Sequence, residues 1–168
     1  AAAAGAVVVD SSSAFRMDPS IPLVVPEVNA RRLSGEPGIV ANPNCVAAIA
    51  VMALAPLHAH AQVRRVIGAT YQSASGAGAA AMAELEASTA AYLEGRPFAP
   101  KVLPHPYAFN FFSHNAGVDL DSGYNGEESK VIEELRKIME LPDLACSFTC
   151  IRVPVLRAHG MALTVELD

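Results

Sequence analysis

The sequence predicts an α/β fold in which short strands alternate with helices. Three observations favour this fold class. Short apolar runs end at Pro, Asn, Asp or Ser, as buried strands do where the chain turns. An Ala-rich segment, Ala79–Leu93, has the composition of a helix and is followed by Gly95 as a C-terminal stop. The strand pattern then returns near the end of the chain, after a second helical segment.

The N-terminal part of the chain predicts short strands followed by a helix. The runs Val7–Val9, Leu23–Val25 and Gly38–Ala41 are apolar and are bounded by turn residues. Val46–Leu54 is small and apolar on all sides, which predicts a buried helix that ends at Pro56.

The C-terminal part predicts a strand, two helices and two further strands. We expect a strand at Val63–Tyr71, and Asn125 is expected to cap a helix over Gly126–Leu141, with Glu128 completing a capping box. The other expected elements are a tight turn at Ser75–Gly78, a loop at Arg96–Pro106, and strands at Cys146–Leu156 and Met161–Leu167.

Composition limits the possible functions. With 168 residues, 52% of them hydrophobic, the chain can bury the core of one domain, or of one domain and part of a second. A net charge of -5 and the lack of a Lys/Arg run argue against nucleic acid or an anionic membrane as the main partner. No apolar run is long enough to cross a bilayer. The three cysteines form no CxxC pair, which favours a reducing compartment over a disulfide framework.

Cys45 is a candidate nucleophile, because it follows a strand, a Pro and two Asn residues and lies where a helix begins. Backbone N–H groups and the positive end of the helix dipole favour a thiolate at such a position. His159, which lies between two strands and precedes Gly160, is its candidate acid/base partner. On position alone, however, a lone Cys is more often a small core residue and a His at a strand end is more often structural.

Two other kinds of site have weaker support. Cys146 and Cys150 are four residues apart, but no second pair completes a tetrahedral metal site, so we predict that no metal is bound. The turn at Ser75–Gly78 could hold a phosphate through its backbone amides, although a GxG turn alone is weak evidence.

Several segments together resemble aspartate-semialdehyde dehydrogenase, over nearly the whole chain and in the order of that family. They are VVVDSSSAFRM, PLVVPEVN, GIVANPNC, ATYQSASGAGAAAM, YAFNFFSHN, GYNGEESK and TCIRVPVLRAH. YAFNFFSHN and GYN are most similar to the plant and algal plastid branch. The resemblance implies a plastid location, or a cytoplasmic one outside plants and algae. It also implies an α+β catalytic and dimerisation domain at 45–168, preceded by the tail of a Rossmann-like NADP-binding domain at 1–44.

The resemblance also implies a reaction and a role for each motif residue. The family reduces L-aspartyl 4-phosphate to L-aspartate 4-semialdehyde with NADPH and releases phosphate. Cys45 would form the thioacyl intermediate, His159 would transfer protons, and Gln72 would orient the intermediate. Arg152 would bind the substrate α-carboxylate and Glu127 its amino group. The phosphate-binding set would be Arg16, Asn44 and Lys130, and the cofactor loop would be Ser75, Gly76 and Gly78.

The sequence also departs from the family pattern. No glycine-rich dinucleotide fingerprint precedes the first strand, so we expect the isolated chain to be incomplete for turnover. Val46-Ala47 stands where the family usually has Ser-Thr, and Gly160-Met161 where it has a small residue and Glu. We expect the ends to be cuts through a larger fold, a processed or incomplete sequence, or, at the start, a tag or poly-Ala stretch.

Two functions are therefore open. One is the NADPH-dependent enzyme, acting on aspartyl phosphate as a homodimer or higher oligomer. The alternative is a non-catalytic descendant that serves as a structural or regulatory subunit of a larger assembly. Upstream sequence distinguishes them, since a GxxGxxG before AAAAGAVVVD supports the enzyme.

Overall fold

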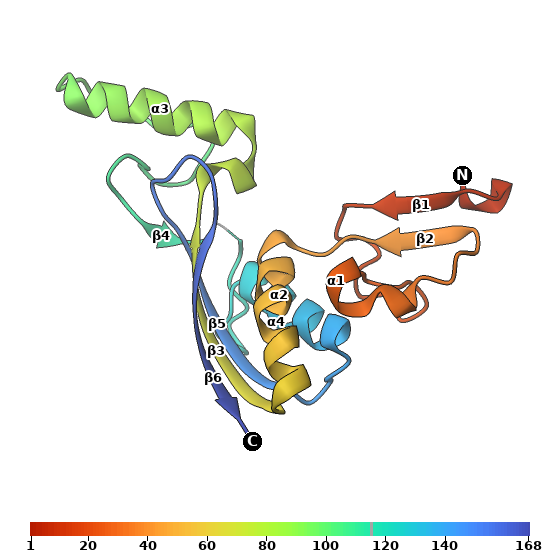
Figure 1. Cartoon of the computed structure of the whole chain (residues 1–168). Coiled ribbons are helices and arrows are strands. Elements are labelled where there is room, and N and C mark those ends of the chain that lie inside the picture. Colours follow the sequence, from red (N-terminus) through yellow and green to blue (C-terminus); the bar gives the residue numbers. More distant parts are fainter. Residues whose placement is uncertain (115) are drawn as a thin grey trace. The chain divides into compact units, whose positions relative to one another are not determined.

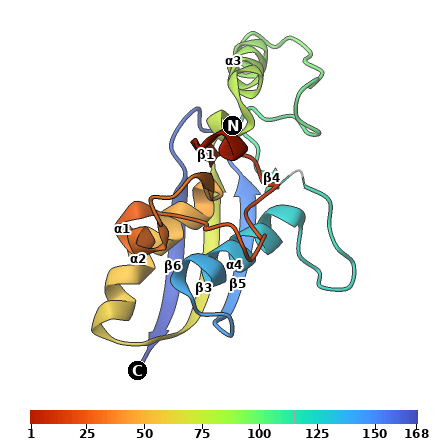
Figure 2. The ribbon, with the colours of Figure 1, turned by 90° about the vertical axis from the view of Figure 1, so that its right-hand side faces the viewer.

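A computed structural model describes residues 1–114 and 116–168 (Figures 1 and 2). It has two compact units: 1–67 with 129–147 and 164–168, and 68–128 with 148–163. In chain order the elements are η1 (Ala2–Ala4), β1 (Val7–Asp10), α1 (Pro26–Asn29), η2 (Ala30–Arg32), β2 (Gly38–Ala41), α2 (Cys45–His60), β3 (Val63–Gln72), η3 (Ala74–Ala77), α3 (Ala79–Leu93), β4 (Phe112–Ser113), α4 (Gly126–Met139), β5 (Ala145–Arg152) and β6 (Gly160–Leu167). The predicted α/β fold class is confirmed.

The first unit contains the parallel pair β1–β2, which runs in register from Val7 opposite Gly38 to Asp10 opposite Ala41. Parallel pairing is the arrangement expected for the Rossmann-like domain that the resemblance implies. The remaining predicted run, Leu23–Val25, is buried, but it forms an isolated bridge, between Leu23 and Ala41, and no named strand. It cannot extend further, because the next residue is a proline that begins α1.

Helix α2 extends beyond Pro56, so the prediction that this proline ends the helix is wrong. Its buried side carries Val46, Val51 and Leu54, among others, and anchors the helix through apolar burial. Pro56 lies on the exposed side, one turn after the exposed Met52. The carbonyl that loses its N–H donor to the proline therefore faces solvent, where water can replace the missing bond.

Helix α4 begins with the predicted capping box. Asn125 Oδ1 accepts hydrogen bonds from the backbone N–H groups of Glu127 (2.9 Å) and Glu128 (3.0 Å). Glu128 Oε2 accepts the N–H of Asn125 in return (2.8 Å). The helix ends at Met139 rather than at the predicted Leu141, because Glu140 adopts a left-handed φ of 58°.

A second sheet has the strand order β4-β5-β3-β6. Within the first unit, α2 and α4 lie on the same side of the segments of β3, β5 and β6 that belong to it (Figures 1 and 2). The short strand β4 was not predicted. It pairs antiparallel to β5, with Phe112 opposite Arg152. Strand β5 ends at Arg152, earlier than the predicted Leu156, because Pro154 lacks the N–H that would continue the ladder.

In the second unit, α3 has the predicted bounds, and Gly95 follows it with a left-handed φ of 64°. The helix packs on a small core that Leu85, Leu103 and Tyr107 share with two alanines. The predicted loop after α3 folds onto the helix by bonding to Glu84. This carboxylate is buried and accepts the backbone N–H groups of residues 101 (2.5 Å), 102 (2.7 Å) and 103 (2.9 Å).

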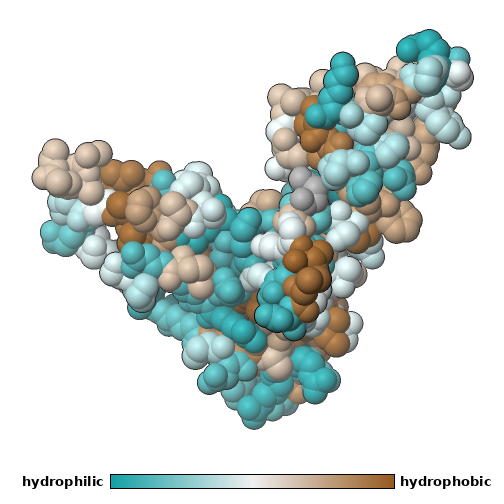
Figure 3. All heavy atoms as spheres, turned by 180° about the vertical axis from the view of Figure 1, so that it is seen from behind, coloured by the Kyte–Doolittle hydropathy of each residue, from teal (hydrophilic) through white to brown (hydrophobic). Residues whose placement is uncertain are grey.

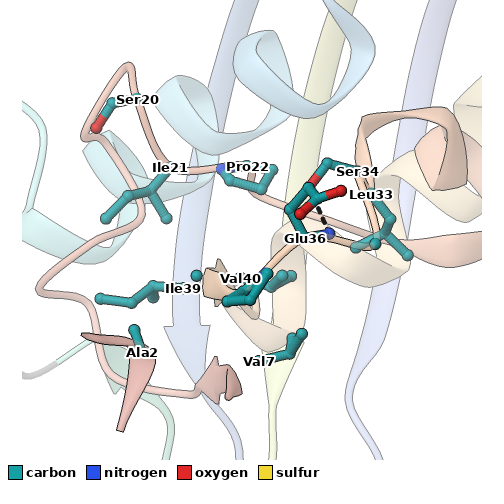
Figure 4. Close-up of a pocket in the computed structure, with 13 residues that line it drawn as sticks. Ala2, Val7, Ser20, Ile21, Pro22, Leu33, Ser34, Glu36, Ile39 and Val40 are labelled. Atoms are coloured by element: carbon teal, nitrogen blue, oxygen red, sulfur yellow. Dashed lines mark hydrogen bonds between the residues drawn. The ribbon is translucent and has the colours of Figure 1, made fainter. Parts of the chain in front are cut away.

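The first unit also contains an apolar pocket of about 530 Å³ beside β1 and β2. Ile21, Leu33, Ile39 and Val40 are among the side chains that line it, as Figure 4 shows. On the face shown in Figure 3, hydrophobic side chains gather over β1 and β2, where Val9 is 69% exposed. None of the predicted site residues, all of which the structure describes, lines this pocket.

We predict that Glu84→Gln lowers the free energy of unfolding by about 2 kcal/mol at pH 7, because the variant loses a charged acceptor of three N–H groups. Burial raises the pKa of Glu84, but these N–H donors lower it more, so that it lies below 4.5. The stabilisation is therefore present above pH 4.5 and is lost as the pH falls through the lowered pKa.

Urea unfolding of the wild type and the variant, repeated over a pH series, measures this difference. Glu86→Gln, at an exposed position of the same helix, is the control and should change stability little. A difference that stays constant down to the acid limit would contradict the assignment.

Candidate active site

Five of the predicted site residues in the second unit lie near the ends of β3, β5 and β6 or at the start of α4: Gln72, Ser75, Glu127, Arg152 and His159. Gln72 is the last residue of β3, and its amide Nε2 donates to Glu127 Oε1 (3.1 Å). Both side chains are buried, Gln72 at 1% exposure and Glu127 at 6%. The amide therefore satisfies part of the buried carboxylate, which would otherwise be costly to remove from water.

Arg152 ends β5 with a guanidinium that is buried and oriented. Its NH1 donates to the carbonyl of Ser73 (2.9 Å), and its NH2 lies 2.8 Å from His114 Nε2. Both of these acceptors are neutral, so these two contacts orient the guanidinium without bringing a negative charge to it. The arrangement suits Arg152 to bind an anion, as predicted from the sequence.

His159 is held beside Ser73 by its ring nitrogen Nδ1. The backbone N–H of Ser73 donates to Nδ1 (3.0 Å), and the Ser73 hydroxyl lies 3.1 Å from the same atom. The preceding residue, Ala158, has a left-handed φ of 69°, which a residue with a Cβ adopts only at a cost in strain. Burial lowers the pKa of His159 from 6.5, and the positive charge of Arg152 lowers it further.

The predicted cofactor loop passes close to this histidine. A Cβ added to Gly76 would lie 2.9 Å from His159 Nε2 and 3.4 Å from Arg152 NH1, so only glycine fits at position 76. Gly78 has a φ of 93°, which also favours glycine. Ser75 bonds to Ser73 through their hydroxyls (3.0 Å), which ties the loop to the same cluster.

In the first unit, Cys45 is the first residue of α2 and is exposed. Asn44 caps the helix, and its Oδ1 accepts the N–H groups of Val46 (2.8 Å) and Ala47 (3.3 Å). The sequence argument that placed the thiol at a helix start is thus confirmed. An exposed thiol at the positive end of a helix is in a setting that favours the thiolate.

A buried carboxylate connects two further predicted residues. Glu134, at 1% exposure, accepts the backbone N–H of Asn44 through Oε2 (2.5 Å) and pairs with Arg16 NH1 through Oε1 (3.1 Å). Arg16 also donates to the carbonyls of Asn42 (2.9 Å) and Ser11 (3.0 Å). Lys130 is exposed on α4, one turn before Glu134.

The structure thus brings the predicted residues together in two groups. Gln72 joins Glu127, and Arg152, His159 and the cofactor loop all contact or closely approach one another around Ser73. Arg16 and Asn44 meet at Glu134, next to Cys45 in the chain. Because Cys45 and His159 belong to different units, their convergence on one cleft stays a prediction.

Comparison with known proteins decides the family. The description "Semialdehyde dehydrogenase, dimerisation domain" matches residues 54–168. The chain belongs to the semialdehyde dehydrogenase family. A second description, "Semialdehyde dehydrogenase, NAD binding domain", matches residues 1–35. The first matched range contains the larger sheet, and the second contains β1.

Several similar proteins are named aspartate-semialdehyde dehydrogenase. The aspartate-semialdehyde dehydrogenases of Synechocystis and of Prochlorococcus marinus are each 48% identical to this chain over 97% of it, and the matched parts are 48% and 47% of their own lengths. The crystal structure of aspartate semialdehyde dehydrogenase II complexed with ASA, from Vibrio cholerae, matches with a TM-score of 0.90 at 38% identity, over 99% of this chain and 50% of that one. The chain thus spans about half the length of the curated relatives it matches.

Three contributors to the site were not predicted: Ser73, His114 and Glu134. Glu134 had a signal, since a carboxylate between apolar residues on the buried side of a helix needs a partner. Ser73 and His114 had none beyond lying next to motif residues. Among the described residues, no group of three or more His, Cys, Asp or Glu side chains could hold a metal ion. No helix in this described part is long and apolar enough to cross a membrane.

We predict that iodoacetamide alkylates Cys45 at least about tenfold faster than Cys146 or Cys150. Cys45 is exposed at a helix start, burial raises the pKa of Cys146, and Cys150 is fully buried. Peptide mass spectrometry over a time course measures the three rates. In the urea-unfolded chain, as a control, the rates should become similar. Equal rates in the folded chain would favour the non-catalytic interpretation.

We also predict that His159 titrates below pH 6.5. Glu127→Gln should lower its pKa further, because Glu127 raises it, and Arg152→Met should raise it. Because the unfolded chain takes up the proton first, stability should decline as the pH falls below 6.5. Histidine NMR signals followed over pH measure the midpoint, and a midpoint at or above 6.5 would contradict the argument.

Proposed function

We propose that this chain is part of an aspartate-semialdehyde dehydrogenase, which reduces L-aspartyl 4-phosphate to L-aspartate 4-semialdehyde with NADPH and releases phosphate. The observation that carries the proposal is an exposed thiol, Cys45, at the capped start of α2 in a chain 48% identical to an enzyme of that name. The family membership supports the same class of reaction.

In the proposed reaction, the Cys45 thiolate attacks the acyl carbon and the bond to phosphate breaks, which leaves a thioester. NADPH, when bound, would supply the hydride that reduces this thioester. Release of the aldehyde returns the electron pair to sulfur, and His159 holds and transfers the proton that the steps require. The proposal requires Cys45, Gln72 and His159 to meet in one cleft.

The proposed substrate contacts follow from charge. Arg152 binds the α-carboxylate and Glu127 the ammonium group, and both are buried side chains that keep their charge oriented. Arg16, Asn44 and Lys130 form the proposed phosphate-binding set. Each guanidinium nitrogen of Arg16 already makes one protein contact, so we expect it to bind phosphate through its remaining N–H groups.

The proposed cofactor is NADP. The loop fits a cofactor next to His159, because glycine at position 76 lets the loop backbone approach His159 and Arg152 closely. Ser75, Gly76 and Gly78 would line it. The match of 1–35 to the NAD binding domain supports the same assignment. The glycine-rich loop for the pyrophosphate is not among residues 1–168, so the cofactor needs further sequence.

We further propose that the protein is a homodimer, which the match to a dimerisation domain supports. The plastid location is proposed from the segments YAFNFFSHN and GYN. The alternative function, a non-catalytic subunit of a larger assembly, is favoured by one observation. Val46-Ala47 and Gly160-Met161 remove side chains that the resemblance leads us to expect beside Cys45 and His159.

A hybrid enzyme tests the proposal, because the curated relatives are about twice as long as this chain. Residues 1–168 replace the aligned segment of the Synechocystis enzyme, and NADPH formation from semialdehyde, phosphate and NADP measures the reverse reaction. We expect turnover within about tenfold of the parent enzyme, and residues 1–168 alone should show none. Cys45→Ala in the hybrid should abolish turnover.

A hybrid that folds but shows no turnover would contradict the proposal that this chain is part of an active enzyme. Activity that appears only after Val46→Ser with Ala47→Thr would favour the non-catalytic descendant, since those two changes restore the family's hydroxyls. Circular dichroism of each hybrid checks that it folds.

A further inference from the structure

His114 is fixed beside Arg152 by the backbone of the second unit. It directly follows β4, whose Phe112 lies opposite Arg152 in the antiparallel ladder. Its own backbone N–H donates to the carbonyl of Cys150 (2.9 Å). The imidazole Nε2 then lies 2.8 Å from Arg152 NH2. Pairing of β4 with β5 thus sets the position of this side chain, independently of any ligand.

The contact fixes the protonation of His114. A guanidinium only donates, so His114 Nε2 must accept, and the ring must be neutral with its proton on Nδ1. The backbone N–H of Ala116 lies 3.3 Å from Nδ1 and would need a lone pair there. A neutral imidazole has one nitrogen lone pair, and the shorter contact with the charged donor takes it.

The same reasoning assigns His159 the opposite tautomer. The N–H of Ser73 donates to His159 Nδ1, so the proton of the neutral ring lies on Nε2. The Arg152 guanidinium lies between the two histidine environments. Its NH1 donates to the Ser73 carbonyl and its NH2 donates to His114 Nε2. Two neutral acceptors on two guanidinium nitrogens fix the plane of the group.

We propose that His114 is a positioning residue, which holds the Arg152 guanidinium in the orientation that binds the substrate carboxylate. The inference rests on the proposed function, in which Arg152 makes that contact. A flexible arginine would lose side-chain entropy when the substrate binds, which weakens binding. The contact with His114 orders the guanidinium before the substrate arrives, so less entropy is lost on binding. An acidic residue in the place of His114 would orient the group as well but would compete with the substrate carboxylate for its charge.

Three variants of the hybrid enzyme test this role by KM for L-aspartate 4-semialdehyde. His114→Leu removes the acceptor and should raise KM roughly ten- to hundredfold, with kcat within about threefold. His114→Gln places an amide oxygen where Nε2 lay and should restore KM to within about threefold. His114→Asn reaches only as far as Nδ1 and should behave like the leucine variant. His60→Leu, at an exposed position, is the control.

An unchanged KM in His114→Leu, or equal KM values for the Gln and Asn variants, would overturn the proposal. If His114 had only a structural role, all three variants would lose folding or kcat. The same kinetic measurements test for that loss of kcat.

Nitrogen NMR of residues 1–168 tests the contact without turnover. At pH 7, His114 should carry its proton on Nδ1, and Arg152→Met should abolish that preference. A cationic His114, or a proton on Nε2, would overturn the inference even if the hybrid is active. If the wild-type hybrid is folded but inactive, the proposed function fails. The NMR measurement of the His114 tautomer then still tests whether His114 Nε2 accepts a hydrogen bond from Arg152.

Discussion

Burial of the Glu134 carboxylate constrains the start of α2. A carboxylate at 1% exposure is tolerated only with strong donors, and this one receives the Asn44 N–H and the Arg16 guanidinium. Asn44 is also the helix cap, so the residue whose backbone N–H bonds to Glu134 is the one whose side chain caps α2. Cys45 follows directly, so the position of the proposed nucleophile depends on a charge carried by α4, far away in the sequence.

Lys137, one turn further along α4, holds the segment that carries Arg16. Its Nζ donates to the carbonyls of Arg16 (2.7 Å), Asp18 (2.7 Å) and Ile21 (3.0 Å). Burial lowers the pKa of Lys137, while the charge of Asp18 raises it. Helix α4 therefore holds the segment from Arg16 to Ile21 at two points. The Glu134 carboxylate binds the Arg16 side chain, and the Lys137 ammonium group binds the backbone carbonyls. The Arg16 guanidinium is thus positioned by its backbone as well as by Glu134.

The predictable part of the fold is the part with local signals. The α3 bounds and the α4 capping box follow from residues within a few positions of each other, and both predictions are confirmed. The passage of α2 through Pro56, the strand β4 and the contact of His114 with Arg152 depend on which side chains face solvent or on pairing across the sheet. Such long-range contacts leave no pattern in a single sequence. Motif resemblance supplied the site residues, but not Ser73, His114 or Glu134, which hold them.

The replacement of the family's Ser-Thr by Val46-Ala47 does not change the local setting that favours a thiolate at Cys45. Asn44 Oδ1 already accepts both N–H groups at these positions, so the helix start needs no hydroxyl there. Both side chains are fully buried, and apolar residues fill that space without leaving a polar group unsatisfied. The substitutions therefore favour packing of α2 and leave Cys45 at the capped N-terminus of the helix. The setting that favours the thiolate at Cys45 is thus intact, so Val46-Ala47 gives no reason to expect a less reactive thiol.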